Sequence, residues 1–342
     1  MYHLFKSLLF LLEPESAHNV TIKLLRFVLK LPFSKKIMQK RFQIDSPKLE
    51  KEIFGLKFKN PIGLAAGFDK NAELIDDFSH LGFGFIEIGT ITPQRQHGNP
   101  QPRLFRLTKD QALINRMGFN NDGVDDAVER LKRRKSSIIV GGNIGKNKVT
   151  PNEKALEDYL ICFRKLYDHV DYFVINVSSP NTPGLRELQE KKPLTKLLDN
   201  LNQENEKNTS PKPLLLKIAP DLSHRQLDDI IAIAKEINLD GMIISNTTTD
   251  RKRLVTSEKK IKSIGEGGLS GAPIFSKSTE VLKYIRKRLP HVPLIAVGGI
   301  LSAKDAIDKM KAGADLVQIY TGLVYKGPGL IKRINKAIVS HS

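Results

Sequence analysis

Ile62-Gly63-Leu64-Ala65-Ala66 is an apolar run with the composition of a buried β-strand, and seven more runs of this kind follow it. They cover residues 85–89, 138–143, 172–177, 214–218, 242–246, 294–298 and 316–320. Helical patterns lie between them, at residues 71–81, 125–134, 151–167, 226–237, 278–289 and 303–312. Strands that alternate with helices pair in parallel. Eight such units predict an α/β fold, a (β/α)8 TIM barrel.

A doubly wound open sheet is the alternative fold. Strands buried on both faces are apolar throughout, and both folds share this feature. An open sheet usually has a Gly-x-Gly-x-x-Gly turn after its first strand, and the sequence has none there. We therefore favour the barrel. Two long connections, residues 91–122 and 250–275, are expected to be lids or walls of a site.

Composition narrows the classes of partner. The 342-residue chain has a net charge of +18, which suits nucleic acid, an anionic membrane surface or small anionic ligands. No zinc-ligand spacing and no aromatic RNA-binding motif accompanies this charge, so we expect neither a metal site nor nucleic-acid binding. Cys162 is the single cysteine, so no internal disulfide can form. We expect an intracellular protein in which Cys162 is a small buried side chain.

Residues 1–45 are expected to form a two-helix extension ahead of a catalytic barrel at residues 46–342. The second helix repeats apolar residues at helical spacing, namely Val20, Leu24, Phe27, Val28 and Leu31. Ser16 is a candidate cap for it. Neither helix has the ~20 apolar residues that span a bilayer. Basic amphipathic helices suit the membrane interface, and a helical hairpin packed on the protein's own core explains the pattern equally well.

Small, amide, hydroxyl or cationic residues follow all eight predicted strands, where barrels of this class place their chemistry. Together they suggest a large polar ligand across the mouth. Lys217 stands inside an apolar strand, where burial is costly unless an anion pairs with it. Gly298-Gly299 and Gly322 follow the last two strands, the usual phosphate site of the fold, although a plain tight turn also explains the glycine pair.

Two further segments carry polar groups. Residues 115–121 contain three asparagines, and amides that both donate and accept suit a cyclic imide or amide ligand; an ordinary Asn/Gly turn is the alternative. Ser179 has no His or second acid near it in sequence and no Gly-x-Ser-x-Gly motif, so a hydrolase triad has no support. As a proton acceptor it would need help, and the residues alone leave its role open.

These motifs together resemble dihydroorotate dehydrogenase, and most closely its class 2, quinone-dependent form. The resemblance covers nearly all of residues 1–340 and is strongest at 65–70, 115–121, 143–148, 176–186, 246–248, 267–271 and 297–300. Class 1 enzymes, which are soluble, have a cysteine where Ser179 stands. Class 2 enzymes have an N-terminal helical extension, which residues 1–41 match, including Glu13-Pro14-Glu15-Ser16-Ala17-His18.

The resemblance implies one non-covalent flavin mononucleotide (FMN) per chain and oxidation of (S)-dihydroorotate to orotate in de novo pyrimidine biosynthesis. Ser179 matches the family's catalytic base. The implied flavin contacts are Ala65, Ala66, Gly67, Phe68, Asp69, Thr90, Asn143, Asn176, Lys217, Ser245, Gly271, Gly299, Tyr320 and Thr321. The implied substrate contacts are Lys70, Asn115, Arg116, Met117, Gly118, Phe119, Asn176, Asn181, Asn246 and Thr247. The flavin phosphate and the orotate carboxylate would then be the anions that explain Lys217 and Lys70.

A membrane quinone is the implied electron acceptor, with His18 and Arg103 beside its head group. The extension would dock on an anionic membrane, which makes the protein a peripheral, monomeric enzyme on the cytoplasmic face of the bacterial inner membrane. Three rival functions remain: a soluble flavin dehydrogenase that uses fumarate or a nicotinamide cofactor, an aldolase or isomerase that binds a phosphorylated metabolite, and a nucleic-acid-binding module. A bound flavin would colour the protein yellow and would exclude the last two.

Overall fold

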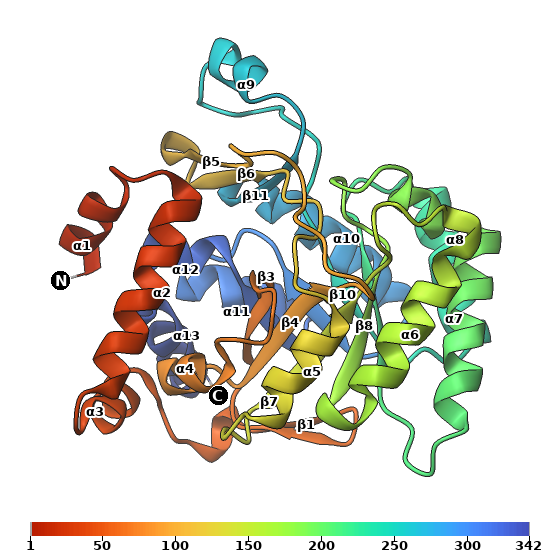
Figure 1. The fold of residues 1–342 in the computed structure, drawn as a ribbon, viewed down its shortest axis with the longest axis horizontal. Coiled ribbons are helices and arrows are strands. Elements are labelled where there is room, and N and C mark those ends of the chain that lie inside the picture. Colours follow the sequence, from red (N-terminus) through yellow and green to blue (C-terminus); the bar gives the residue numbers. More distant parts are fainter. Residues whose placement is uncertain (1, 342) are drawn as a thin grey trace.

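The computed structural model describes residues 2–341 and contains a closed barrel of eight parallel strands (Figure 1). In chain order the strands are β3 (Ile62–Asp69), β4 (Phe85–Ile91), β7 (Ile139–Ile144), β8 (Tyr172–Asn176), β9 (Leu214–Ile218), β10 (Gly241–Ile244), β12 (Leu294–Val297) and β13 (Leu316–Ile319). Each coincides with a predicted run to within a few residues. Closure through the β13–β3 pair confirms the barrel over the open sheet.

The helices around the barrel are α4 (Ile75–Phe78), α5 (Val124–Lys132), α6 (Ala155–Leu166), α7 (Lys191–Glu206), α8 (His224–Glu236), α10 (Phe275–Arg288), α11 (Ala303–Lys311), α12 (Thr321–Lys326) and α13 (Gly329–His341). The helix predicted at 71–81 was wrong at residues 71–74. The carboxylate of Asp69 accepts the N–H groups of Glu73 and Leu74, both at 2.8 Å, so the chain first makes a turn. Only the short α4 and a 3-10 turn follow.

Apolar side chains close the barrel at the amino ends of its strands. The hairpin of β1 (Lys51–Ile53) and β2 (Leu56–Phe58) lies across this end, and Phe58 packs edge-on against Phe85 with ring centroids 5.3 Å apart. The cluster above it contains Tyr172, Val174, Leu215, Ile243, Ile295 and Leu316, all fully buried. A ligand can therefore enter only at the carboxyl ends of the strands.

The two long connections fold together above the barrel mouth. They supply β5 (Leu104–Leu107), β6 (Ala112–Asn115) and β11 (Gly268–Gly271), which form a three-stranded antiparallel sheet, and the second connection also contains α9 (Glu258–Ile264) (Figure 1). Residues 91–122 and 250–275 are thus one wall made of two distant segments, which sequence reasoning described only as separate loops.

The N-terminal extension contains α1 (Tyr2–Leu9), α2 (Pro14–Lys30) and α3 (Ser34–Phe42), of which α3 was not predicted. The capping role of Ser16 was wrong: α2 begins at Pro14, whose missing N–H is tolerated there, and Glu13 occupies the N-cap position. Helix α2 has two apolar faces. Ala17, Ile22 and Leu29 are buried, whereas much of the predicted stripe is exposed, namely Val20, Leu24, Phe27 and Leu31. Within residues 2–341, no helix is both long and apolar enough to cross a bilayer.

Candidate active site

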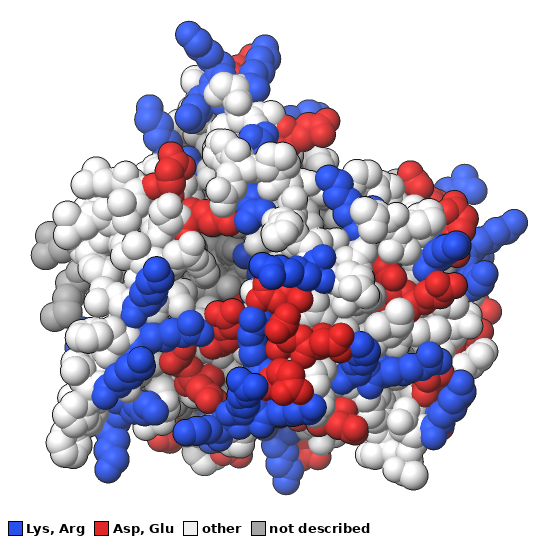
Figure 2. All heavy atoms as spheres, in the orientation of Figure 1, with Lys and Arg blue, Asp and Glu red and all other residues white. Residues whose placement is uncertain are grey.

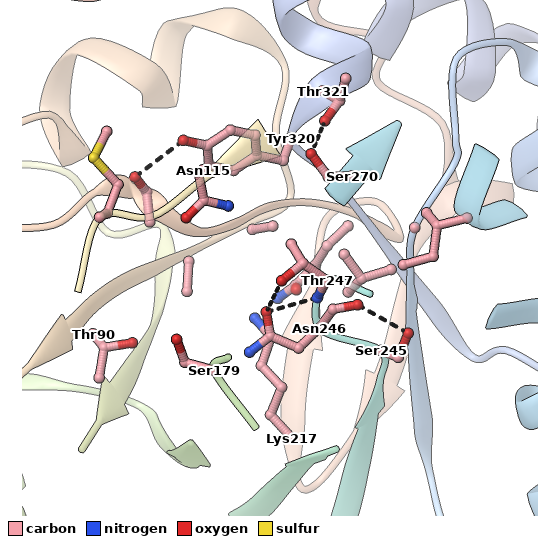
Figure 3. A pocket seen from close by; sticks show the side chains of 18 of the residues that line it. Thr90, Asn115, Ser179, Lys217, Ser245, Asn246, Thr247, Ser270, Tyr320 and Thr321 are labelled. Carbon is pink, nitrogen blue, oxygen red and sulfur yellow. Dashed lines mark hydrogen bonds between the residues drawn. The ribbon is translucent and has the colours of Figure 1, made fainter. Parts of the chain in front are cut away.

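A cavity opens at the carboxyl ends of the barrel strands, beneath the small sheet (Figure 3). The empty space inside it, including open solvent at its mouth, is about 1060 Å³. Sequence-predicted residues that line it are Ala65, Ala66, Gly67, Lys70, Thr90, Asn115, Met117, Gly118, Phe119, Asn176, Ser179, Asn181, Lys217, Ser245, Asn246, Thr247, Gly271, Gly299, Tyr320 and Thr321. Barrel closure thus gathers residues that are up to 256 positions apart in sequence.

Amide and hydroxyl groups form a connected floor. Thr90 donates its hydroxyl to Asn143 Oδ1 at 2.6 Å, and Asn176 Nδ2 donates to Thr90 Oγ1 at 2.8 Å. Asn246 Nδ2 donates to Ser178 Oγ at 3.0 Å and continues the network toward β10. Since these groups hold one another, the floor is organised before any ligand arrives.

Lys217 is paired with a carboxylate that sequence reasoning missed. Its Nζ lies 3.0 Å from Glu87 Oε1, and Glu87 is completely buried. The flavin is therefore not needed as the sole anion for Lys217. Glu87 carries the signal that identified Lys217, a charged residue inside an apolar strand, and the same argument applied to residues 85–89 would have found it.

Ser179 lies between Thr90 and Lys217 in Figure 3 and faces the cavity. Its Oγ accepts the backbone N–H of Asn181 at 3.2 Å. The Asn181 amide in turn donates to Asn115 Oδ1 at 2.9 Å, so the loop after β8 is tied to the wall sheet. A backbone N–H directed at a hydroxyl oxygen stabilises negative charge on that oxygen, which favours proton transfer from it or through it.

Glycines shape the end of the cavity near β12 and β13. A side-chain carbon on Gly299, where φ is +78°, would lie 2.5 Å from the Phe275 side chain, and one on Gly322 would lie 2.1 Å from the Ile300 carbonyl. Ser270 and Thr321 share a hydrogen bond of 2.8 Å beside them (Figure 3). Backbone N–H groups without side chains over them, together with hydroxyls, suit a phosphate.

Six predicted contacts lie outside the cavity lining, namely the flavin contacts Phe68, Asp69 and Asn143, the substrate contact Arg116, and the quinone contacts His18 and Arg103. Asn143 lies below the floor, and Asp69 binds backbone N–H groups. Arg116 donates to the carbonyls of Pro102 and Ile264. Phe68 faces α2, where the ring of His18 packs against it at 5.0 Å. Gly298 and Gly322 of the predicted phosphate site and Asn120 of the predicted asparagine loop also line the cavity, and the structure adds Ser270, Ile274, Val297, Ile300, Gln318 and Ile319, which were not predicted.

A second, mainly apolar cleft lies between α1, α2 and the barrel. Its lining includes Phe5, Leu9, Ala17, His18, Ile22, Leu25, Val28, Phe68 and Tyr320. Tyr320 borders both hollows, so the cleft leads toward the cavity. Burial lowers the pKa of His18 to about 4, with Lys70 adding to the effect, so the imidazole is neutral at pH 7. Arg103, the other predicted quinone contact, forms an ion pair with Glu15 on α2, with Nη2 and Oε1 2.7 Å apart.

Lys70 stands at the border of these two regions. Burial lowers its pKa to about 8, opposed by Glu15 and assisted by Arg103. An ammonium with this pKa is charged at neutral pH and can bind a carboxylate, but it loses its proton under mildly alkaline conditions.

Comparison with known proteins gives a consistent result. The family model described as dihydroorotate dehydrogenase matches residues 48–341. A dihydroorotate dehydrogenase (quinone) of Christiangramia forsetii is 53% identical over 98% of both chains, and one of Idiomarina loihiensis is 48% identical over 100% of both. The ligand-free DHODH structure from Eimeria tenella is 40% identical, with a TM-score of 0.86, over 96% of this chain and 94% of that one.

Proposed function

The chain belongs to the dihydroorotate dehydrogenase family, as an oxidoreductase of its quinone-dependent class, and we propose that it oxidises (S)-dihydroorotate to orotate with FMN and a membrane quinone. The observation that carries this proposal is that Ser179, five asparagines, Lys217 and the glycine cradle all line one cavity. One chain supplies all of these groups, so the proposed site needs no residue from a second subunit.

The cavity fits FMN in two respects. The backbone N–H groups of the cradle at Gly299 and Gly322 would bind the phosphate, and a side chain at either position would collide with Phe275 or with the Ile300 carbonyl and displace the cradle. At the floor, Thr90, Asn176 and Lys217 add polar groups to the cavity lining, and these suit the polar edge of a flavin ring. Bound FMN would supply the hydride acceptor. Lys217, on the cavity floor, would contact the flavin ring, and Thr321, beside the glycine cradle, would contact the phosphate.

The substrate would lie between the floor and residues 115–119, held by Asn115, Asn176, Asn181 and Asn246. Their amides can match the donors and acceptors of a cyclic imide. Ser179 would take the proton from substrate C5 while its own hydroxyl proton passes to a water, since its Oγ faces the cavity and accepts the Asn181 N–H. Lys70 would bind the carboxylate of the substrate, for which its ammonium is charged at pH 7.

We infer that residues 1–45 are a separate functional unit that docks on an anionic membrane and admits the quinone. Nine large apolar side chains of this segment are exposed, including Leu11 at 83%, Phe27 at 63% and Phe33 at 74%. Such side chains would enter the acyl layer while nearby Lys and Arg meet headgroups. The quinone would then reach Tyr320 through the apolar cleft beside His18 and Arg103. This arrangement corresponds to a peripheral protein on the cytoplasmic face of a bacterial inner membrane.

The face in Figure 2 argues against a nucleic-acid partner, because Lys and Arg alternate there with Asp and Glu instead of forming one basic stripe.

The decisive experiment is an absorbance spectrum of the purified protein, recorded after reconstitution with FMN. The spectrum is recorded before and after dihydroorotate is added in the absence of air. We expect a flavin band that bleaches. A colourless protein, or a band that dihydroorotate leaves unchanged, would refute the proposed function.

A further inference from the structure

Four polar side chains form a layer across the barrel at the floor of the cavity. Glu87, Asn143, Lys217 and Gln318 come from β4, β7, β9 and β13, and none is more than 4% exposed. The apolar cluster around Phe85 and Leu215 lies in the same barrel interior. A carboxylate buried in such surroundings is costly unless its oxygens are fully paired, so its presence calls for an explanation.

The oxygens of Glu87 are indeed paired by three N–H donors from three strands. Oε1 accepts Lys217 Nζ at 3.0 Å and Asn143 Nδ2 at 2.7 Å, and Oε2 accepts Gln318 Nε2 at 2.5 Å. A glutamine at this position would turn an NH2 group toward at least one of these donors. The site is therefore built for a carboxylate and not merely for a polar side chain of that size.

Lys217 and Gln318 line the cavity, whereas Glu87 lies behind them (Figure 3 shows Lys217 at the floor). A ligand on the floor thus meets a cation whose counter-charge is 3.0 Å away. The nearby Tyr172 hydroxyl does not alter this balance, because burial, assisted by the charge of Glu87, raises the pKa of Tyr172 well above its usual range. The field that reaches the ligand is that of an ion pair, which is weaker than that of a lone ammonium.

We propose that Glu87 is a positioning residue that partly neutralises Lys217 and so lowers the reduction potential of a flavin bound on this floor. The inference rests on the proposed function, since it needs the flavin there. The reduced flavin is anionic, and an unpaired ammonium beside it would stabilise it so strongly that electron transfer to the quinone becomes unfavourable. With Glu87 in place, the flavin still accepts two electrons from dihydroorotate and can pass both to the quinone.

The test is the midpoint potential of the holoenzyme, measured by equilibration with a redox dye. Glu87→Gln keeps the size and removes the charge, and should raise the potential by at least about 30 mV, a tenfold change for a two-electron couple. Glu87→Asp keeps the charge and removes one methylene, and should stay near wild type. Lys217→Met should shift the potential in the opposite direction. Reoxidation of Glu87→Gln by decylubiquinone should become slower relative to its reduction.

A purely structural role predicts the reverse order, because Glu87→Asp disturbs the packing more than the isosteric Gln. An unchanged or lower potential in Glu87→Gln, or an equal shift in Glu87→Asp, overturns the proposal. Glu87→Gln could fail to retain flavin, and the test then uses Glu87→Asp. If the midpoint potential of Glu87→Asp shifts from the wild-type value as far as that of Lys217→Met, the proposal is also overturned. Wild-type protein is measured first: failure to bind or bleach flavin refutes the proposed function, whereas normal bleaching isolates the role of Glu87.

Discussion

The cavity at the barrel mouth and the cleft under the N-terminal helices share Tyr320 but differ in how their side chains work. In the cavity, amides, hydroxyls and one ion pair are linked at 2.6–3.1 Å, so each position depends on its partners. In the cleft and on the outer face of α2, aliphatic and aromatic side chains contribute area and are largely interchangeable. Single substitutions should therefore matter in the first region, and several together in the second.

The largest expected effect is at Ser179. We expect Ser179→Ala to slow the reduction of bound flavin by dihydroorotate about 10²- to 10⁴-fold, the usual contribution of a positioned proton acceptor. Flavin content should not change, and stopped-flow absorbance measures both. Ser263→Ala, at an exposed position of α9, is the matched control. Near-wild-type reduction in Ser179→Ala would remove this residue from the base role.

The second effect separates the two regions. Changing Leu11, Phe27 and Phe33 together to Gln removes exposed apolar area from the extension. If each side chain contributes about 1 kcal/mol to the free energy of membrane binding, the affinity for vesicles should fall about 100-fold. Flavin reduction should be unaffected, because the cavity is untouched. The control changes Val149, Ile161 and Val255, which are exposed on the barrel. Equal losses in both variants, measured by co-sedimentation with anionic vesicles, would contradict a membrane role specific to the extension.

A third prediction concerns the glycine cradle. Gly299→Ala would place a methyl group 2.5 Å from Phe275, and overpacking of this kind costs roughly 1–3 kcal/mol. FMN affinity should fall about tenfold or more, as measured by fluorescence on reconstitution. Gly55→Ala is the control, since its φ of +72° imposes similar backbone strain with nothing within 4 Å. If both variants bind FMN like wild type, the cradle does not hold the phosphate.

The smallest effect is a pH dependence at the border of the two regions. Burial holds the pKa of Lys70 at about 8 in the free protein. If its ammonium binds the substrate carboxylate, orotate affinity is constant below pH 8 and falls about tenfold per pH unit above it, as the proton is lost. Titration by flavin absorbance at several pH values checks this. Lys70→Arg should abolish the decline, and a decline that persists there would point to another group.

Much of the fold could be predicted because its signals are local. Strand runs such as 214–218 coincide with the structure, since parallel strands buried on both faces are continuously apolar. The errors fall where a side chain redirects the backbone. Residues 71–74 have helical spacing, but the carboxylate of Asp69 accepts the backbone N–H groups of Glu73 and Leu74. These side-chain contacts stabilise a turn in competition with a helix.

In the candidate site, too, local patterns revealed some residues, whereas their contacts depend on the fold. Lys217 stood out because a charge inside an apolar strand is conspicuous. Its pairing with Glu87 follows from the position of β4 and β9 around the barrel, which no local pattern encodes. The likeness of Arg103 to a quinone contact came from a motif, whereas its ion pair with Glu15 depends on how α2 lies against β5.

The order of strands and helices, the residue types after each strand and the presence of a buried lysine were determined by the sequence alone, because period, polarity and backbone preference act over a few residues. The tertiary structure decided which carboxylate faces that lysine, how residues 91–122 and 250–275 join into one wall, and which side of α2 stays exposed. These outcomes depend on barrel closure, which brings distant side chains within hydrogen-bonding distance and therefore cannot be read from neighbouring residues.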